Sequence, residues 1–204
     1  SEVITAKSVA DAQQMRRLYE PPPVRIEIVP PPVEHALFSP ADQQCARAAL
    51  GLGRGPMLMF VGRIQPLKGV DVAVEAFAAL GRPDATLLVV GGASGPEGQA
   101  EVERLRHRIA QLGLRDSVRF VDPQPHHMLG TYYRAADVVL APSRSESFGL
   151  VALEAAAGGT PVVASAVGGL RNLIDHGHTG FLVEGRDPLV FASFADEVLS
   201  NPML

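Results

Sequence analysis

Two cationic side chains, Arg63 and Lys68, follow the apolar run of residues 57–61 and lie five residues apart. Gly62 and Gly69 flank them and permit tight turns. An arginine and a lysine that converge at the end of a strand suit the charges of a diphosphate. Lys68 also stands at the expected start of a helix, where the helix dipole disfavours a cation, so its position calls for another reason. The residues alone leave open a second interpretation, two solvated surface cations.

A serine-rich loop at residues 143–147 leads from another apolar run into an expected helix at residues 148–157. The first N–H groups of a helix have no acceptor within it and form a ready site for an anion. A glycine at position 149 would let a ligand approach the backbone closely. A phosphate group is therefore expected at the N–H groups of Phe148, Gly149, Leu150 and Val151.

Two glutamates accompany this loop and helix. Glu146 lies in the loop, and Glu154 lies within the helix among alanine, leucine and valine residues. An acidic side chain in so apolar a segment usually has a partner or a function. The alternative is a purely structural pair, in which Glu146 caps the helix and Glu154 is buried against a backbone group.

Other chemistries have weaker support in the sequence. The glycine-rich stretch at residues 91–98 lacks the G-x-G-x-x-G spacing of dinucleotide sites, and the glycine pair at 168–169 means little alone. The sequence contains no G-x-S-x-G elbow, no G-x-x-x-x-G-K-[ST] loop and no pair of cysteines for zinc. The histidines at 126–127 and at 176 and 178 lie in polar, turn-like stretches, which makes metal binding the weaker interpretation.

The elements that position these residues follow a repeating pattern. From residue 57 onward, short apolar runs alternate with segments that carry apolar residues at helical spacing, which predicts βα units. Runs that are apolar on both faces, such as residues 85–90, are typical of a parallel sheet covered by helices on both sides. Residues 54–204 are therefore predicted to form a doubly wound α/β domain. The expected strands are residues 57–61, 85–90, 117–121, 138–141, 161–164 and 180–183, and the expected helices are residues 68–80, 97–112, 126–136, 148–157 and 188–199.

Residues 1–53 differ from the rest of the chain in their proline content and in the pattern of their apolar residues. Residues 2–6 and 24–29 are expected strands and residues 8–18 an expected helix, with proline runs at 21–23 and 30–32. Proline at this density stops regular structure and stiffens a connection. We expect residues 1–29 to be the last βαβ unit of another domain, joined by a linker at residues 30–53.

Composition excludes several classes of protein. The chain has 204 residues, 47% of them hydrophobic, which is enough for a buried core. A net charge of -4 and an aromatic content of 5% speak against nucleic acid as a partner. The single cysteine, Cys45, fits a reducing compartment, and no apolar run reaches the about 18 residues of a membrane helix. A cytoplasmic protein without a membrane span is the expectation.

The arrangement of these motifs is similar to the signature of retaining glycosyltransferases of the GT-B fold, the group 1 family, which uses nucleotide-sugar donors. The stretch Gly62-Arg63 followed by Lys68-Gly69, and Glu146 separated from Glu154 by seven residues, carry the resemblance in the expected order. The resemblance implies a Rossmann-like C-terminal donor-binding domain over residues 54–204. Within the family, the residues most resemble the mycothiol-biosynthesis subfamily, which transfers N-acetylglucosamine from UDP to 1L-myo-inositol 3-phosphate.

The resemblance also implies roles for particular residues. It makes Arg63, Lys68 and Glu146 the catalytic residues, the first two at the donor diphosphate and the third at the transferred sugar. Gln124 would contact the uracil through its main chain, Glu154 would bind the ribose hydroxyls, and Gly62 and residues 148–151 would complete the donor site. The family's Mg²⁺ site, formed largely by main-chain atoms, maps to Tyr133, Arg134, Ala136 and Thr160.

The sequence also departs from the family. The interdomain loop, usually Pro-Gly-Val-Asp, is here Pro31-Pro32-Val33-Glu34, which stiffens the link. The family's acceptor-binding residues lie in an N-terminal domain of which only the last unit is expected here, so these 204 residues alone are expected to bind donor without transferring it. The full-length protein could be a homodimer. The alternatives are a transferase for GDP-mannose or another nucleotide sugar, and a non-catalytic nucleotide-sugar binding module.

Overall fold

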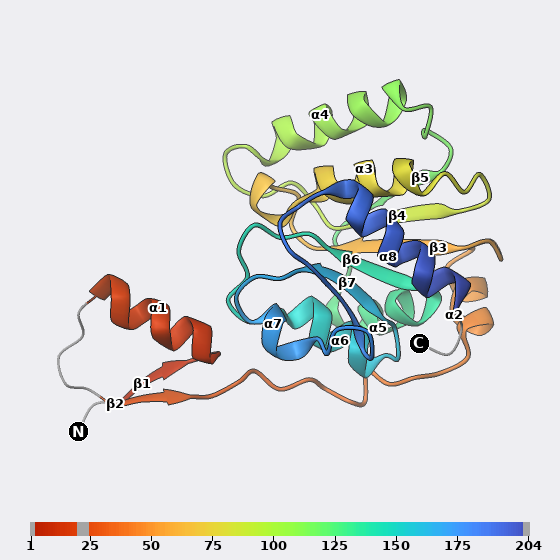
Figure 1. Cartoon of the computed structure of the whole chain (residues 1–204). Helices are drawn as coiled ribbons and strands as arrows, with labels where there is room; N and C mark the ends of the chain where they lie inside the picture. The colour runs from red at the N-terminus through yellow and green to blue at the C-terminus, as the bar shows by residue number, and fades with distance from the viewer. Residues whose placement is uncertain (1–2, 20–24, 202–204) are drawn as a thin grey trace.

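The computed structural model describes residues 3–19 and 25–201. Its centre is a six-stranded parallel sheet with the strand order β5-β4-β3-β6-β7-β8 (Figure 1). The first of these strands in sequence, β3, therefore lies in the middle, and the order reverses between β3 and β6. The strands are β3 (Met57–Val61), β4 (Thr86–Val90), β5 (Val118–Val121), β6 (Val138–Ala141), β7 (Val162–Ser165) and β8 (Gly180–Val183).

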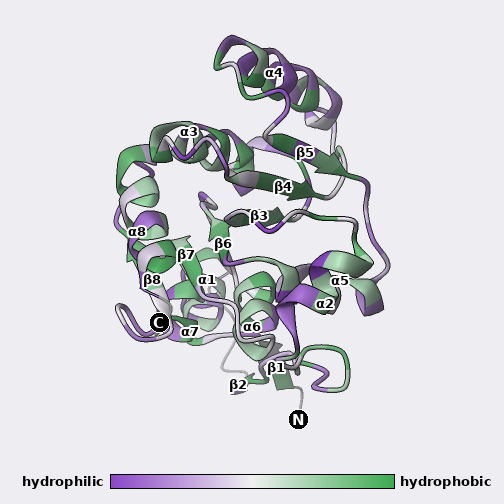
Figure 2. Ribbon diagram, turned by 90° about the vertical axis from the view of Figure 1, so that its right-hand side faces the viewer, coloured by the Kyte–Doolittle hydropathy of each residue, from purple (hydrophilic) through white to green (hydrophobic). Residues whose placement is uncertain are grey.

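Helices cover both faces of this sheet, and the hydrophobic strands lie between them (Figure 2). One face packs against α3 (Val70–Leu80), α4 (Gly98–Gln111) and α8 (Pro188–Ser200), and the other against α2 (Gln43–Ala49), α5 (His126–Ala135), α6 (Leu150–Ala157) and α7 (Leu170–Leu173). Alternate residues of β3 supply the two cores: Leu58 and Phe60 join the first, and Met57 and Met59 join the second. The doubly wound fold expected from runs that are apolar on both faces is confirmed.

A small βαβ unit precedes the main sheet. Strands β1 (Val3–Ala6) and β2 (Arg25–Ile28) pair in parallel, with α1 (Val9–Tyr19) between them in sequence. The unit lies to one side of the main sheet (Figure 1), and the hydroxyl of Ser8 donates a hydrogen bond of 2.8 Å to the carbonyl of Ser147. Its surface is unusually apolar, with Val3, Ile4, Val9, Leu18, Tyr19, Ile28 and Val29 all exposed.

The segment of residues 30–53 contains a helix that the sequence pattern did not predict. The carboxylate of Asp42 caps α2 by accepting from the Cys45 N–H at 2.6 Å. From this helix the guanidinium of Arg47 reaches Asp137 at 2.7 Å and the carbonyl of Ala135 at 2.8 Å. Phe38 of the same segment is fully buried in the second core. From Phe38 through α2, the segment is therefore packed onto the main domain.

The expected strands of the main sheet agree with the structure to within one residue at each end, but two helix starts were wrong. Lys68 ends the short 3₁₀ helix η1 (Pro66–Lys68), and α3 begins only at Val70, because Gly69 between them is left-handed with φ of +75°. Likewise α6 begins at Leu150 because Gly149 has φ of +100°. Glu2, Val24 and the prolines at 21–23, which belonged to expected elements, lie outside the described residues.

Candidate functional site

The loops expected to bind a donor lie at the carboxyl ends of the strands. Gly62 and Arg63 follow β3 and Gln124 follows β5, and together with residues 91–94 after β4 they line one pocket of about 370 Å³. The side chain of Gln124 donates to the carbonyl of Asp122 at 2.9 Å. Arg63 is exposed and forms no hydrogen bond or ion pair with the described part of the chain, so its guanidinium is available to an anion.

Lys68 and Glu146 form an ion pair in which the ammonium lies 2.7 Å from the carboxylate. Both side chains are about one fifth exposed, at 22% and 20%. Lys68 follows β3 and Glu146 follows β6, the two strands between which the sheet order reverses. In open α/β sheets, the crevice outside the carboxyl ends of the strands at such a reversal is where ligands bind.

Backbone contacts hold the loops of Lys68 and Glu146 against each other. The Arg144 N–H donates to the carbonyl of Leu67 at 2.9 Å. A Cβ atom at Gly69 would lie 2.1 Å from the carbonyl oxygen of Pro142, so only glycine fits there. The ion pair thus bridges two loops that already touch.

Gly168 and Gly169, which follow β7, also contact the backbone of the Glu146 loop. The Gly169 N–H donates to the carbonyl of Glu146 at 3.0 Å. A Cβ atom at Gly168 would lie 1.8 Å from that same oxygen, and Gly168 has φ of +48°. The pair therefore sets the backbone position of Glu146, a role that the sequence alone did not reveal.

The amino end of α6 lies directly after this loop. Among the described residues no side chain caps it, and Glu146 in particular does not, which removes the capping alternative. The N–H groups of Leu150 and Val151 thus begin a helix whose first turn has no side-chain acceptor. Phe148 is buried, and a Cβ atom at Gly149 would lie 2.8 Å from the Leu170 side chain, so packing also requires this glycine.

Glu154 is buried on α6, with 7% of its surface exposed, and two side chains satisfy its carboxylate. The hydroxyl of Tyr133 donates to Oε2 at 2.8 Å, and Nε2 of His126 lies 2.8 Å from Oε1. The partners are therefore side chains and not the backbone group of the structural alternative. Burial, with the adjacent carboxylate of Glu154, raises the pKa of the Tyr133 hydroxyl well above its ordinary value, so Tyr133 remains a donor at neutral pH.

Of the four residues expected at a Mg²⁺ ion, three are neighbours in sequence and Thr160 contacts them from 27 positions after Tyr133, but their polar groups are already engaged. The carbonyl of Tyr133 accepts from the Thr160 hydroxyl at 2.7 Å and from the Ala136 N–H at 3.1 Å. The Arg134 guanidinium donates to the carbonyls of Leu37 and Ser39. The set includes no carboxylate, and the described residues hold no cluster of three or more His, Cys, Asp or Glu side chains that could bind a metal. These residues as arranged do not fit Mg²⁺, and we derive no step through a metal.

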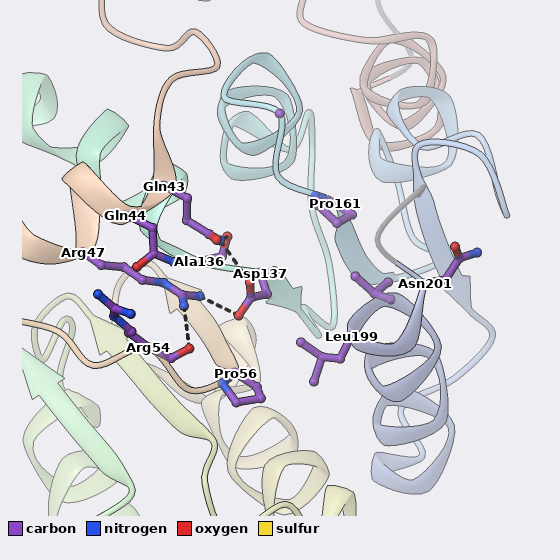
Figure 3. Close-up of a pocket in the computed structure, with 12 residues that line it drawn as sticks. Gln43, Gln44, Arg47, Arg54, Pro56, Ala136, Asp137, Pro161, Leu199 and Asn201 are labelled. Carbon is purple, nitrogen blue, oxygen red and sulfur yellow. Dashed lines mark hydrogen bonds and ion pairs between the residues drawn. The ribbon is translucent and has the colours of Figure 1, made fainter.

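A larger pocket of about 470 Å³ lies at the amino ends of the strands, before the first residues of β3, β6 and β7 (Figure 3). The Arg47–Asp137 ion pair lies in its wall, and Gln43 also donates to Asp137, at 3.0 Å. Asp137 further accepts from the Met57 N–H at 2.6 Å. These contacts tie α2 to β3 and β6, which makes this pocket a structural junction, remote from the strand ends where ligands bind.

The structure thus groups the expected site residues in three places: Gly62, Arg63 and Gln124 at one pocket, Lys68 with Glu146 at the strand reversal, and Glu154 behind them on α6. Sequence reasoning missed the side chains of His126 and Tyr133 as partners of Glu154. The apolar surroundings of Glu154 signalled that a partner was needed. They could not identify it, because both partners lie on a different helix, 21 or more residues earlier.

The match to a family model defines the class of protein. Residues 42–204 match the model of glycosyl transferases group 1, and the chain belongs to this family. Among curated proteins, it is 50% identical over 192 residues to the D-inositol 3-phosphate glycosyltransferase of Frankia alni, covering 91% of this chain and 47% of that protein. It is 48% identical over 202 residues to the enzyme of the same name from Mycolicibacterium vanbaalenii, covering 94% and 44%. The chain spans about half the length of these relatives.

Solved structures of glycosyltransferases share the fold. Sucrose-phosphate synthase from Thermosynechococcus elongatus superposes with a TM-score of 0.89 at 34% identity, covering 99% of this chain and 50% of that one. Anabaena HepE in complex with UDP and glucose gives a TM-score of 0.89 at 26% identity, covering 99% and 54%. The GT-B expectation for the fold is confirmed. Within the described residues, no helix has the length and apolar character required to cross a membrane.

Proposed function

We propose that residues 54–204 form the donor-binding domain of a retaining glycosyltransferase that uses a UDP-sugar. The observation that carries this proposal is the pocket at the ends of β3, β4 and β5, where the loop of Gln124 meets the guanidinium of Arg63, which has no partner among the described residues. The Anabaena protein HepE, which has this fold, was solved with UDP and with UDP-glucose. In the proposal, Gln124 contacts the uracil through its main chain and Glu154 binds the ribose hydroxyls.

The mechanism that we propose is electrostatic. As the bond between the sugar and UDP breaks, negative charge grows on the departing diphosphate. Arg63, Lys68 and the free N–H groups of Leu150 and Val151 offset that charge, and such preorganised groups are typically worth roughly 10² to 10³ in rate each. Glu146 contacts the transferred sugar, so the contact between Lys68 and Glu146 joins the diphosphate part of the site to the sugar part.

The proposed substrates follow from the relatives. Proteins named D-inositol 3-phosphate glycosyltransferase are 43–50% identical to this chain over most of its length. We therefore propose UDP-N-acetylglucosamine as donor and 1L-myo-inositol 3-phosphate as acceptor for the whole enzyme. The proposal includes no Mg²⁺ at Tyr133, Arg134, Ala136 and Thr160, because the contacts of these residues do not fit the ion.

The first βαβ unit supports the proposed domain division. Its described residues expose seven large apolar side chains, more than expected for a small unit that no other part of the protein covers. We propose that residues 1–29 belong to the acceptor-binding domain and that residues 30–53 connect it to the donor domain. Transfer then requires that other domain, and closure of the two domains over the substrates is part of the cycle.

Calorimetric titration of the 204-residue chain with UDP, GDP and ADP tests the donor site. We expect selective UDP binding, weakened about tenfold or more in Lys68→Ala, because hydrogen bonds to a charged group are the stronger kind. Lys7→Ala is the matched control, since Lys7 is the only other lysine and lies in the first unit. Selective GDP binding would shift the assignment to a GDP-sugar transferase, and no nucleotide binding would contradict the proposed site.

A transfer assay separates an enzyme from a non-catalytic binding module. With UDP-N-acetylglucosamine and 1L-myo-inositol 3-phosphate, the 204-residue chain is expected to show no turnover, and the full-length protein is expected to transfer. Glu146→Ala should abolish transfer in the full-length protein while sparing UDP affinity. Turnover by the 204-residue chain would contradict the need for a second domain, and no turnover by the full-length protein would favour a binding module.

A further inference from the structure

Both oxygens of the Glu154 carboxylate are held by side chains that the proposed function has not yet used. The Tyr133 hydroxyl donates to Oε2 and His126 contacts Oε1, each at 2.8 Å. We propose that Tyr133 and His126 are positioning residues, which orient the Glu154 carboxylate toward the two ribose hydroxyls of the nucleotide. This inference rests on the proposed function, because it assumes that Glu154 binds the ribose.

The two partners differ in burial, which suits them to different parts of one task. Tyr133 is fully buried and donates to Oε2, whereas the His126 side chain is 59% exposed and contacts Oε1. Because the carboxylate only accepts hydrogen bonds, the His126 nitrogen that faces it must carry the proton. Each carboxylate oxygen has two lone pairs, so both still have capacity for a hydroxyl of the ligand.

A third residue keeps the two partners in place. His126 and Tyr133 stand seven residues apart on α5, a spacing that puts them on the same face of the helix. The ring of Phe38 packs against both, with ring centroids 4.9 Å from His126 and 5.9 Å from Tyr133. Because Phe38 is fully buried, it restricts the motion of both rings.

A positioning role for Tyr133 and His126 predicts a measurable effect on how the site distinguishes nucleotides with and without ribose hydroxyls. A fixed carboxylate can accept from two vicinal hydroxyls at once, whereas one that rotates freely loses that advantage. A purely structural role for Tyr133 would change only the stability of the fold. A positioning role would also change how strongly the site distinguishes UDP from 2′,3′-dideoxy-UDP, which lacks both hydroxyls.

The experiment compares the affinity of the 204-residue chain for these two nucleotides by calorimetry. In the wild type, UDP should bind roughly 10- to 100-fold more tightly, as expected for hydrogen bonds to a charged acceptor. In Tyr133→Phe this ratio should fall below about threefold. Tyr132→Phe is the matched control, because its hydroxyl makes no hydrogen bond within the described part of the chain, and it should keep the wild-type ratio.

Variants of the exposed His126 side chain provide a second test of the same affinity ratio, without changing a fully buried residue. His126→Ala should reduce the ratio several-fold, and His126→Gln, whose side-chain amide can donate to Oε1, should restore it. His127→Ala, at the exposed neighbouring position, should leave the ratio unchanged. If Tyr133→Phe fails to fold, the His126 series still decides the question.

The outcomes separate this inference from the proposed function. UDP binding with an unchanged ratio in both Tyr133→Phe and His126→Ala would overturn the positioning role and leave the donor site standing. Wild-type binding without discrimination between the two nucleotides would overturn the ribose role of Glu154 and the positioning role together. No UDP binding by the wild type would overturn the donor site itself.

Discussion

The ammonium of Lys68 lies 2.7 Å from the carboxylate of Glu146, across the point where the strand order of the sheet reverses. If Lys68 binds the donor diphosphate, the diphosphate and Glu146 compete for one cation. Glu146→Gln should then bind UDP at least as tightly as the wild type, and up to about fivefold more tightly, the worth of a partly exposed ion pair. Titration calorimetry measures this. Glu184→Gln is the control, because it removes an exposed carboxylate that follows β8 at the edge of the sheet. A threefold loss of affinity in Glu146→Gln would contradict the competition.

Gly168 should be intolerant of a side chain. In Gly168→Ala the new Cβ would lie 1.8 Å from the Glu146 carbonyl, so the backbone of one loop must move. We expect a loss of unfolding free energy of about 2 kcal/mol or more, measured by urea denaturation, together with weaker UDP-sugar binding. Gly113→Ala is the control: Gly113 also has a positive φ, +73°, but its Cβ would meet no atom within 4 Å. It should cost only about 1 kcal/mol of backbone strain, and equal losses in the two variants would refute a special role for Gly168.

The Arg47–Asp137 pair should stabilise the fold without affecting the donor site. Arg47→Ala would remove a buried guanidinium that donates to Asp137 and to the carbonyls of Ala135 and Arg54, while Asp137, 27% exposed, would keep its hydrogen bonds from Gln43 and Met57. The cost should be about 1.5–3 kcal/mol. Arg54→Ala, at the exposed arginine of the same pocket, should change stability by no more than about 0.5 kcal/mol. Urea denaturation measures both, and UDP affinity below the melting range should stay at the wild-type value in each. A stability loss below about 1 kcal/mol in Arg47→Ala would argue against the pair as a structural junction.

Alkaline pH should destabilise the chain through Tyr133. A tyrosine in the unfolded chain loses its proton near pH 10, whereas burial and Glu154 raise the pKa of Tyr133 in the folded state. Above about pH 10 the folded state therefore binds more protons than the unfolded state, so the free energy of unfolding falls as pH rises toward the folded-state pKa. Urea denaturation between pH 8 and pH 11 should show a shallower fall for Tyr133→Phe than for the wild type. Parallel pH curves for the two proteins would count against this.

The main sheet could be predicted from the sequence because each of its strands is a short apolar run with its own local signal. Residues 57–61 and 138–141, for example, correspond to β3 and β6 without a shift. α2 was missed because its seven residues, rich in alanine and glutamine, show no apolar period and follow a proline-rich stretch. The predicted helix starts near Lys68 and Phe148 were wrong for a different reason. The left-handed conformations of Gly69 and Gly149, which delay each helix, depend on tertiary contacts.

In the candidate site too, some features could be predicted from the sequence and others could not. Arg63, Lys68, Glu146 and Glu154 are recognisable because charged residues at strand ends or in apolar helices are unusual. Their mutual contacts are not local: the Lys68–Glu146 pair joins residues 78 positions apart. No periodicity or spacing in one sequence encodes which cation meets which acid, so the pairing emerges only when β3 and β6 lie side by side.

The Arg47–Asp137 ion pair lies at the amino ends of the strands, and the loops of the candidate site lie at their carboxyl ends. Mutations that alter the loops can therefore accumulate during evolution while the anchoring end stays constant. Under the proposed function, this separation would allow a lineage to change the sugar or the base that it accepts without first acquiring a more stable fold. For protein engineers, the positions to diversify are those of the loops after β3 and β6 other than Gly69 and the proposed site residues, and α2 is the place to leave untouched.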